Sequence, residues 1–119
     1  QIKELLSVCV TANGASATTM QWQSVPTVGS AATISLATAT LANATAGTTV
    51  MLLPTTLATA PIIVTAANGG VQVGLSTTAN HITVLDGALK LVIATGPTTG
   101  TWYHCIRYYP LTPDSIING

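Results

Sequence analysis

Hydrophobic and polar residues alternate along much of the second half of the chain, from Pro61 to Pro110. A period of two is typical of β-strands that bury one face. The clearest run is 102–109, in which Trp102, His104, Ile106 and Tyr108 alternate with Tyr103, Cys105, Arg107 and Tyr109. Shorter runs at 71–75, 82–84 and 89–93 are separated by Gly-containing turns. The pattern predicts a β-meander that closes on a hairpin between 89–93 and 100–106.

The first half of the chain carries the same alternation in shorter pieces. Residues 3–6 could begin as a helical turn, but Leu6, Val8 and Val10 favour a strand over about 5–11. A second strand, 18–23, has Met20 and Trp22 on one face and is expected to form a hairpin with the first. Two further strands are predicted at 33–41 and 48–53. The apolar run in 48–53 suits a strand that is buried on both faces.

These elements predict an all-β fold, either an antiparallel β-sandwich or a jelly-roll-like barrel. The 119 residues are enough for one core and show no domain boundary. We therefore expect a single β domain over residues 1–119, with a short C-terminal tail over about 110–119.

Charge is scarce in this sequence. Charged residues make up 5% of the chain and the formal net charge is zero, whereas an ordinary soluble domain has roughly 25% charged residues. One interpretation is a monomer with a Thr-covered surface; the other, which we favour, is a subunit that hides apolar faces in an assembly. Three basic residues cannot form a nucleic-acid footprint, and no apolar run has the roughly twenty residues of a membrane-spanning helix.

The candidate chemical groups are few. Cys9 and Cys105 lie in the first and last predicted strands, so they could form a disulfide or remain two free thiols. His81 and His104 lack the spacing of a zinc site, and no nucleophile elbow or phosphate-binding loop is present. We therefore predict no catalytic residue, metal or cofactor, and no enzymatic activity.

The aromatic residues of 102–109 fall on two faces of the predicted strand, for which we predict different roles. Trp102 and Tyr108 share a face with Ile106 and are predicted to belong to the core. Tyr103 and Tyr109 share the opposite face with Arg107. We predict that Tyr103, Arg107 and Tyr109 contact a partner, with a neighbouring subunit favoured over a sugar.

Several segments together resemble a β-module of bacteriophage structural proteins, especially head fibres, decoration proteins and tail-fibre tips. The resemblance covers 33–106 and is carried by Thr33-Ile34-Ser35-Leu36, Gly47-Thr48-Thr49-Val50, Ile62 to Gly70, Leu89-Lys90-Leu91-Val92-Ile93 and Gly100-Thr101-Trp102-Tyr103-His104-Cys105-Ile106. Such modules are usually trimeric. The resemblance implies a structural role in a virus particle and assigns no functional residue.

The expected function is therefore that of a capsid decoration, cement or head-fibre protein on the capsid exterior. Its partners would be copies of itself, as a homotrimer, and a major capsid or other virion protein, held by apolar contacts that depend little on salt. One alternative is a receptor- or carbohydrate-binding tip of a tail fibre or adhesin. Another is a secreted extracellular domain, for which a Cys9–Cys105 disulfide would speak.

Overall fold

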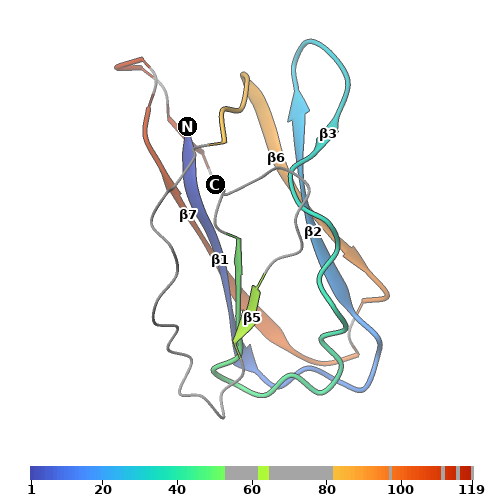
Figure 1. Ribbon diagram of the computed structural model, residues 1–119. Coiled ribbons are helices and arrows are strands. Elements are labelled where there is room, and N and C mark those ends of the chain that lie inside the picture. The colour runs from blue at the N-terminus through green and yellow to red at the C-terminus, as the bar shows by residue number, and fades with distance from the viewer. Residues whose placement is uncertain (53–61, 65–81, 97, 111, 115, 119) are drawn as a thin grey trace.

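The computed structural model is an all-β protein, as the alternation predicts. It describes residues 1–52, 62–64, 82–96, 98–110, 112–114 and 116–118. Within these ranges the chain forms strands and no helix (Figure 1). The strands are β1 (Ile2–Thr11), β2 (Thr19–Pro26), β3 (Ala32–Thr33), β4 (Thr49–Leu52), β5 (Ile62–Val64), β6 (Gly87–Ala94) and β7 (Thr101–Tyr108).

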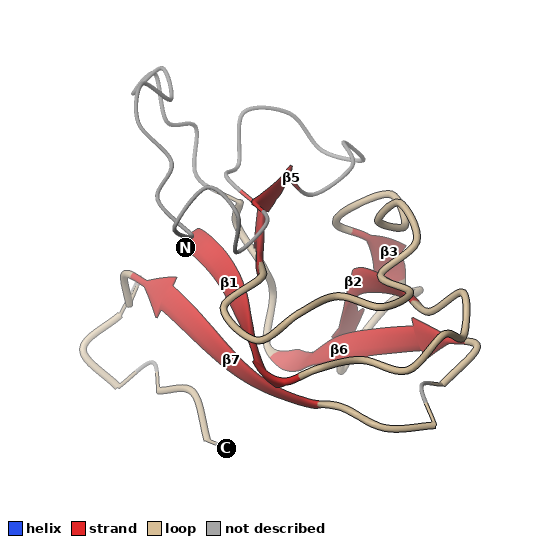
Figure 2. Ribbon diagram, turned by 90° about the horizontal axis from the view of Figure 1, so that it is seen from below, coloured by secondary structure: helices blue, strands red, loops and turns tan. Residues whose placement is uncertain are grey.

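The strands form two antiparallel sheets. One has four strands in the order β5-β4-β1-β7, and the other has three in the order β3-β2-β6. Figure 2 shows the two sheets as separate layers. Buried side chains from both sheets lie between them, so the fold resembles a β-sandwich. The expected trimer is a matter of assembly and stays a prediction.

Two hydrophobic clusters fill the space between the sheets. The members of the larger cluster are Ile2, Leu5, Trp22, Ile34, Leu52 and Ile82. The members of the smaller cluster are Met20, Leu41 and Val50, against which Trp102 packs. Met20 and Trp22 are 2% and 5% exposed, which confirms that they share the buried face of β2.

β1 begins earlier than the sequence indicates, and the helical turn considered for 3–6 is wrong. A bulge between Ile2 and Glu4 shifts the register between β1 and β7. A bulge places an extra residue in one strand. Ile2 and Leu5, three positions apart, therefore both reach the core, which simple alternation would not allow.

Both long hairpins predicted from the sequence are wrong. β1 pairs with β7 and β4, whereas β2 pairs with β6 and β3, so the chain changes sheet between β1 and β2 and again between β6 and β7. Asn13 lies in the first of these crossings, where its Oδ1 accepts from Trp102 Nε1 of β7 at 3.1 Å and its Nδ2 donates to the Leu41 carbonyl, between β3 and β4, at 3.1 Å. Gly100 adopts φ of 121°, and a side chain there would meet Asn13. The crossings are thus fixed by contacts between distant residues.

The strand predicted for 33–41 is shorter than expected. Ala32 and Thr33 pair with β2, and the following residues bond to β2 in another way. Ser35 Oγ accepts from the Trp22 N–H and Thr38 Oγ1 accepts from the Met20 N–H, both at 3.0 Å. Side-chain hydroxyls thereby replace backbone carbonyls as acceptors, while the N–H groups of Ile34 and Thr38 still donate to the carbonyls of Trp22 and Met20.

The remaining predicted strands are 48–53 and the early part of the meander. β4 confirms a strand within 48–53, but its burial alternates: Val50 and Leu52 are buried, whereas Thr49 and Met51 are half-buried. Of the meander, the predicted strand 71–75 and the turn before it lie outside the described residues. Ile82 forms an isolated bridge with Ile2.

Candidate functional site

β7 presents different chemistry on its two faces, and its register with β1 decides which residues share a face. Ser7 lies opposite His104, Leu6 opposite Cys105 and Val8 opposite Tyr103. Ser7 is buried, whereas Leu6 and Val8 are half-buried. Directly opposed residues on neighbouring strands project to the same side of a sheet. His104 therefore faces the interior, and Tyr103 and Cys105 face outwards.

His104 connects the two layers on the inner face. Its Nδ1 lies 2.7 Å from Ser7 Oγ, and its ring meets the Trp22 ring edge-on at 6.0 Å between centroids. Partial desolvation lowers the pKa of His104 from its ordinary value of 6.5, which favours the neutral ring. Ser7 is 1% exposed, which leaves its hydroxyl no access to a substrate. The pair therefore orients the imidazole and joins β1 to β7.

None of the inward side chains of β7 is fully covered, and His104 itself remains exposed. Trp102 and Ile106 are half-buried against the two core clusters, which agrees with their predicted place on the core face. Tyr108, opposite Ile2, remains 37% exposed and lies at the rim. β7 is the last strand of its sheet, so no further described strand covers that side.

The outward side of the four-stranded sheet is apolar at its centre. Five residues form what we call the β1–β7 outer face: Leu6 and Val8 of β1, Met51 of β4, and Tyr103 and Cys105 of β7. Leu6 has Met51 on one side and Cys105 on the other, and Val8 stands between Tyr103 and the polar Thr49 of β4. Tyr103 is 72% exposed. The solvent side of an antiparallel sheet is ordinarily polar, so this face is a candidate contact surface.

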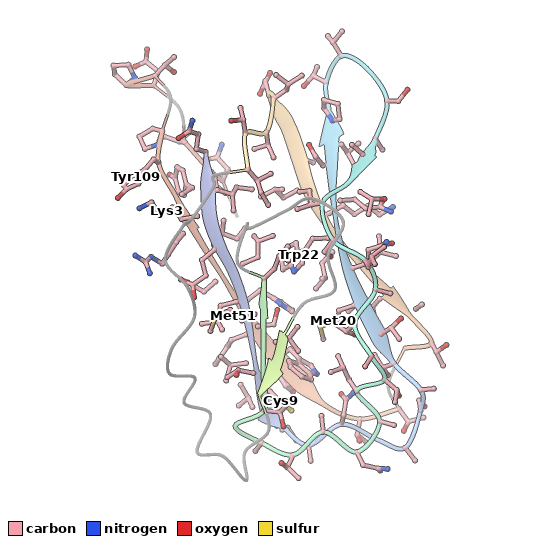
Figure 3. All side chains as sticks on the ribbon, in the orientation of Figure 1. Lys3, Cys9, Met20, Trp22, Met51 and Tyr109 are labelled. Carbon is pink, nitrogen blue, oxygen red and sulfur yellow. The ribbon has the colours of Figure 1, made fainter. Side chains whose placement is uncertain are left out.

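A charged cluster lies at the end of β7 beyond this face. Arg107 Nη1 donates to Glu4 Oε2 at 3.1 Å, and Lys3 Nζ lies 4.4 Å from the centroid of the Tyr109 ring. Figure 3 shows Lys3 and Tyr109 together at this end. The hydrogen bond and charge of Lys3, with a smaller contribution from Arg107, lower the pKa of Tyr109. A cavity of about 290 Å³ opens here, lined by Lys3, Ile106, Arg107, Tyr108 and Tyr109.

The three predicted contact residues therefore belong to two neighbouring places. Arg107 and Tyr109 line the cavity, whereas Tyr103 belongs to the β1–β7 outer face, about 13 Å away along the strand at 3.3 Å per residue. Lys3 and Glu4, which come from the opposite end of the chain, were not among the predicted contact residues. The available signal was the disulfide considered for Cys9 and Cys105, which would require the first and last strands, both of them charged, to be neighbours.

The two cysteines are free thiols, so the disulfide considered from the sequence is absent. Their strands are indeed neighbours, but Cys9 lies opposite Trp102 and Cys105 lies opposite Leu6. Cys9 is buried on the inner side and Cys105 is exposed on the outer side. Burial also raises the pKa of the Cys9 thiol. The sheet itself separates the two sulfur atoms.

The described residues contain no group of three or more His, Cys, Asp or Glu side chains that could hold a metal ion. In the same part of the chain, no helix is long and apolar enough to cross a membrane. Comparison of the chain with protein-family models, curated proteins and solved structures gave no match. The apolar outer face and the lined cavity at the end of β7 therefore carry the functional argument.

Proposed function

We propose that this chain is a structural subunit of a virus particle, a capsid decoration, cement or head-fibre protein on the capsid exterior. The observation that carries the proposal is the β1–β7 outer face, an apolar patch at the centre of a sheet where polar residues are ordinarily found. The partners are copies of this chain, as a homotrimer, and a major capsid or other virion protein. The sequence resemblance to phage structural modules is the reason for proposing a virus particle, and the β-sandwich-like fold is consistent with this proposal.

The physics of such a contact is simple. Burying apolar surface contributes about 25 cal/mol per Å², and a standard interface covers roughly 800 Å² on each partner. The five side chains of the β1–β7 outer face would form the centre of such an area. None of them is charged, so the association should change little with ionic strength. β6 and β7 each end a sheet among the described strands, and their edges could pair with strands of a neighbour.

The proposal is tested by the solution mass of the purified chain, measured by light scattering after size exclusion at low and high salt. The wild type should be a trimer or larger at both salt concentrations. Tyr103→Lys places a charge on the outer face at a 72% exposed position and should shift the mass towards the monomer. Val28→Lys makes a charged substitution in the loop after β2, at an 82% exposed position, and should leave the mass unchanged.

Two results would contradict the proposed self-association. One is a wild-type monomer at every concentration. The other is an assembly that dissociates when salt is raised, since this would show that ion pairs, and not apolar burial, hold the subunits.

A second role, a receptor- or carbohydrate-binding tip, is favoured by a different observation. The cavity at the end of β7 combines cationic and aromatic side chains, which ligand sites for polar molecules often use. Tyr109 is 51% exposed beside it. A glycan array is the direct test of this role, and an array without hits would count against it.

A further inference from the structure

Half of the charged side chains of this protein lie in one place. The chain has three basic and three acidic residues. Three of these six, Lys3, Glu4 and Arg107, meet at the end of β1 and β7, within reach of Tyr109. The Glu4 carboxylate offsets the Arg107 guanidinium, which leaves the Lys3 ammonium as the remaining side-chain charge of the cluster. In a chain with so few charged residues, the grouping of three of them at one position indicates a binding function there.

The cavity beside this cluster has the lining of a small ligand site. Its volume of about 290 Å³ suits a single sugar ring better than a long chain. Lys3 supplies an ammonium with three donor hydrogens, of which one is used by the Tyr109 hydroxyl. Arg107 uses Nη1 for Glu4, and its side chain is 69% exposed, so further donor groups face solvent. The remaining lining residues, Ile106 and Tyr108, are apolar or aromatic.

We propose that this cavity binds a carboxylate-bearing sugar, such as a uronic acid residue of an acidic polysaccharide. Lys3 binds the carboxylate, Arg107 donates to ring hydroxyls or to the same carboxylate, and the Tyr108 ring contacts the apolar side of the sugar. The inference specifies the ligand of the second proposed role and is independent of the assembly role.

An acidic peptide is the main competing ligand. A peptide that adds to a strand edge uses side-chain sites repeated every two residues along the strand. The outward residues of β7 that precede Arg107 are Cys105 and Tyr103, neither of which has a basic side chain. One anionic group is therefore recognised at one position, which favours the sugar.

The test compares two sugars that differ only in the carboxylate. The full chain is titrated with methyl glucuronide and, separately, with methyl glucoside, and binding is followed by NMR chemical shifts. The glucuronide should bind saturably with a Kd on the order of 1 mM, as expected for a ligand of one ring in an open site. The glucoside should bind about tenfold more weakly, because it lacks the charge-assisted hydrogen bonds.

Two lysine variants provide the matched control. Lys3→Gln should weaken glucuronide binding about tenfold, since it removes the ammonium that faces the carboxylate. Lys90→Gln removes the same group from β6, in the other sheet, and should leave the affinity unchanged. Lys3→Arg, which keeps the charge, should retain most of the binding.

The inference is overturned if the glucuronide causes no saturable shifts, if the glucoside binds equally well, or if Lys3→Gln has no effect. A short poly-aspartate peptide that binds more tightly than the glucuronide would overturn it in favour of a peptide site. A glycan array with neutral hits but no acidic ones would overturn this inference and leave the receptor role standing. A change in solution mass would concern the assembly role alone.

Discussion

Two adjacent leucines of β1 test which side of the four-stranded sheet is the core. Leu5 is 1% exposed and lies between Leu52 of β4 and Ile106 of β7. Leu6, the next residue, is half-buried on the β1–β7 outer face. Leu5→Ala and Leu6→Ala therefore remove the same atoms from the same strand on opposite sides, and each serves as the control for the other.

The magnitudes follow from burial. Leu5→Ala removes side-chain carbon from a site where it is almost fully covered, and such substitutions cost about 2–5 kcal/mol through lost transfer free energy and the cavity left behind. Leu6 is already in partial contact with water, and no closed cavity forms there, so Leu6→Ala should cost less than about 1.5 kcal/mol in the monomer. Because a domain is stable by about 5–15 kcal/mol, the first loss is a large fraction of the total.

Urea unfolding followed by tryptophan fluorescence measures both values, since Trp22 is buried in the core and Trp102 is half-buried. The midpoint should fall clearly for Leu5→Ala and little for Leu6→Ala. Protein concentration must be low enough to keep both variants monomeric, because burial of Leu6 by a neighbour would raise its apparent cost. Equal losses for the two variants in the monomer would refute the assignment of the core to the inner side.

Three further predictions follow from single groups. Because the pKa of His104 is lowered in the folded state, the unfolded chain takes up a proton on this side chain more readily. The contribution of His104 to folding stability should therefore be complete above pH 6.5, the ordinary pKa, and decline as the pH falls below it. Urea midpoints between pH 5 and 8 measure this dependence, and His104→Gln should weaken it. Cys105 should react quickly with a thiol reagent in the native protein and Cys9 only after unfolding, because Cys9 is buried and its pKa is raised, and equal rates would contradict this. Thr49→Val should be neutral or stabilise by up to about 1 kcal/mol in thermal unfolding, because the buried Thr49 hydroxyl has no hydrogen-bond partner among the described residues, whereas a clear loss would indicate a partner elsewhere.

The direction of side chains was predictable from the sequence, whereas the pairing of strands was not. Alternation placed Trp102 and His104 on one side of the last strand and Tyr103 and Arg107 on the other, as the register with β1 confirms. Alternation is a local property of a strand and depends only on burial of one face. Pairing depends on which strands meet, and here the first strand meets the last, so the predicted hairpins failed.

Only part of the candidate site could be predicted from the sequence, because the rest depends on which strands pair. Arg107 and Tyr109 could be singled out because they stand together in one aromatic strand. Lys3 and Glu4 join them through the bulge at the start of β1, about a hundred residues earlier in the chain. Sequence patterns carry no information on such a shift of register. The charged residues themselves can be read from the sequence, but their proximity arises only from the tertiary structure.

The separation of the two outward features along β7 has a consequence for function. Tyr103 and Arg107 point to the same side but lie four residues apart, so the β1–β7 outer face and the lined cavity are neighbours that share no residue. A subunit that buried its outer face in an assembly could therefore still present the cavity at the end of β7. Apolar side chains would supply the affinity between subunits and the few charges would recognise a ligand. The scarcity of charge elsewhere on the chain then makes physical sense, because charge on the assembly face would cost desolvation without providing recognition.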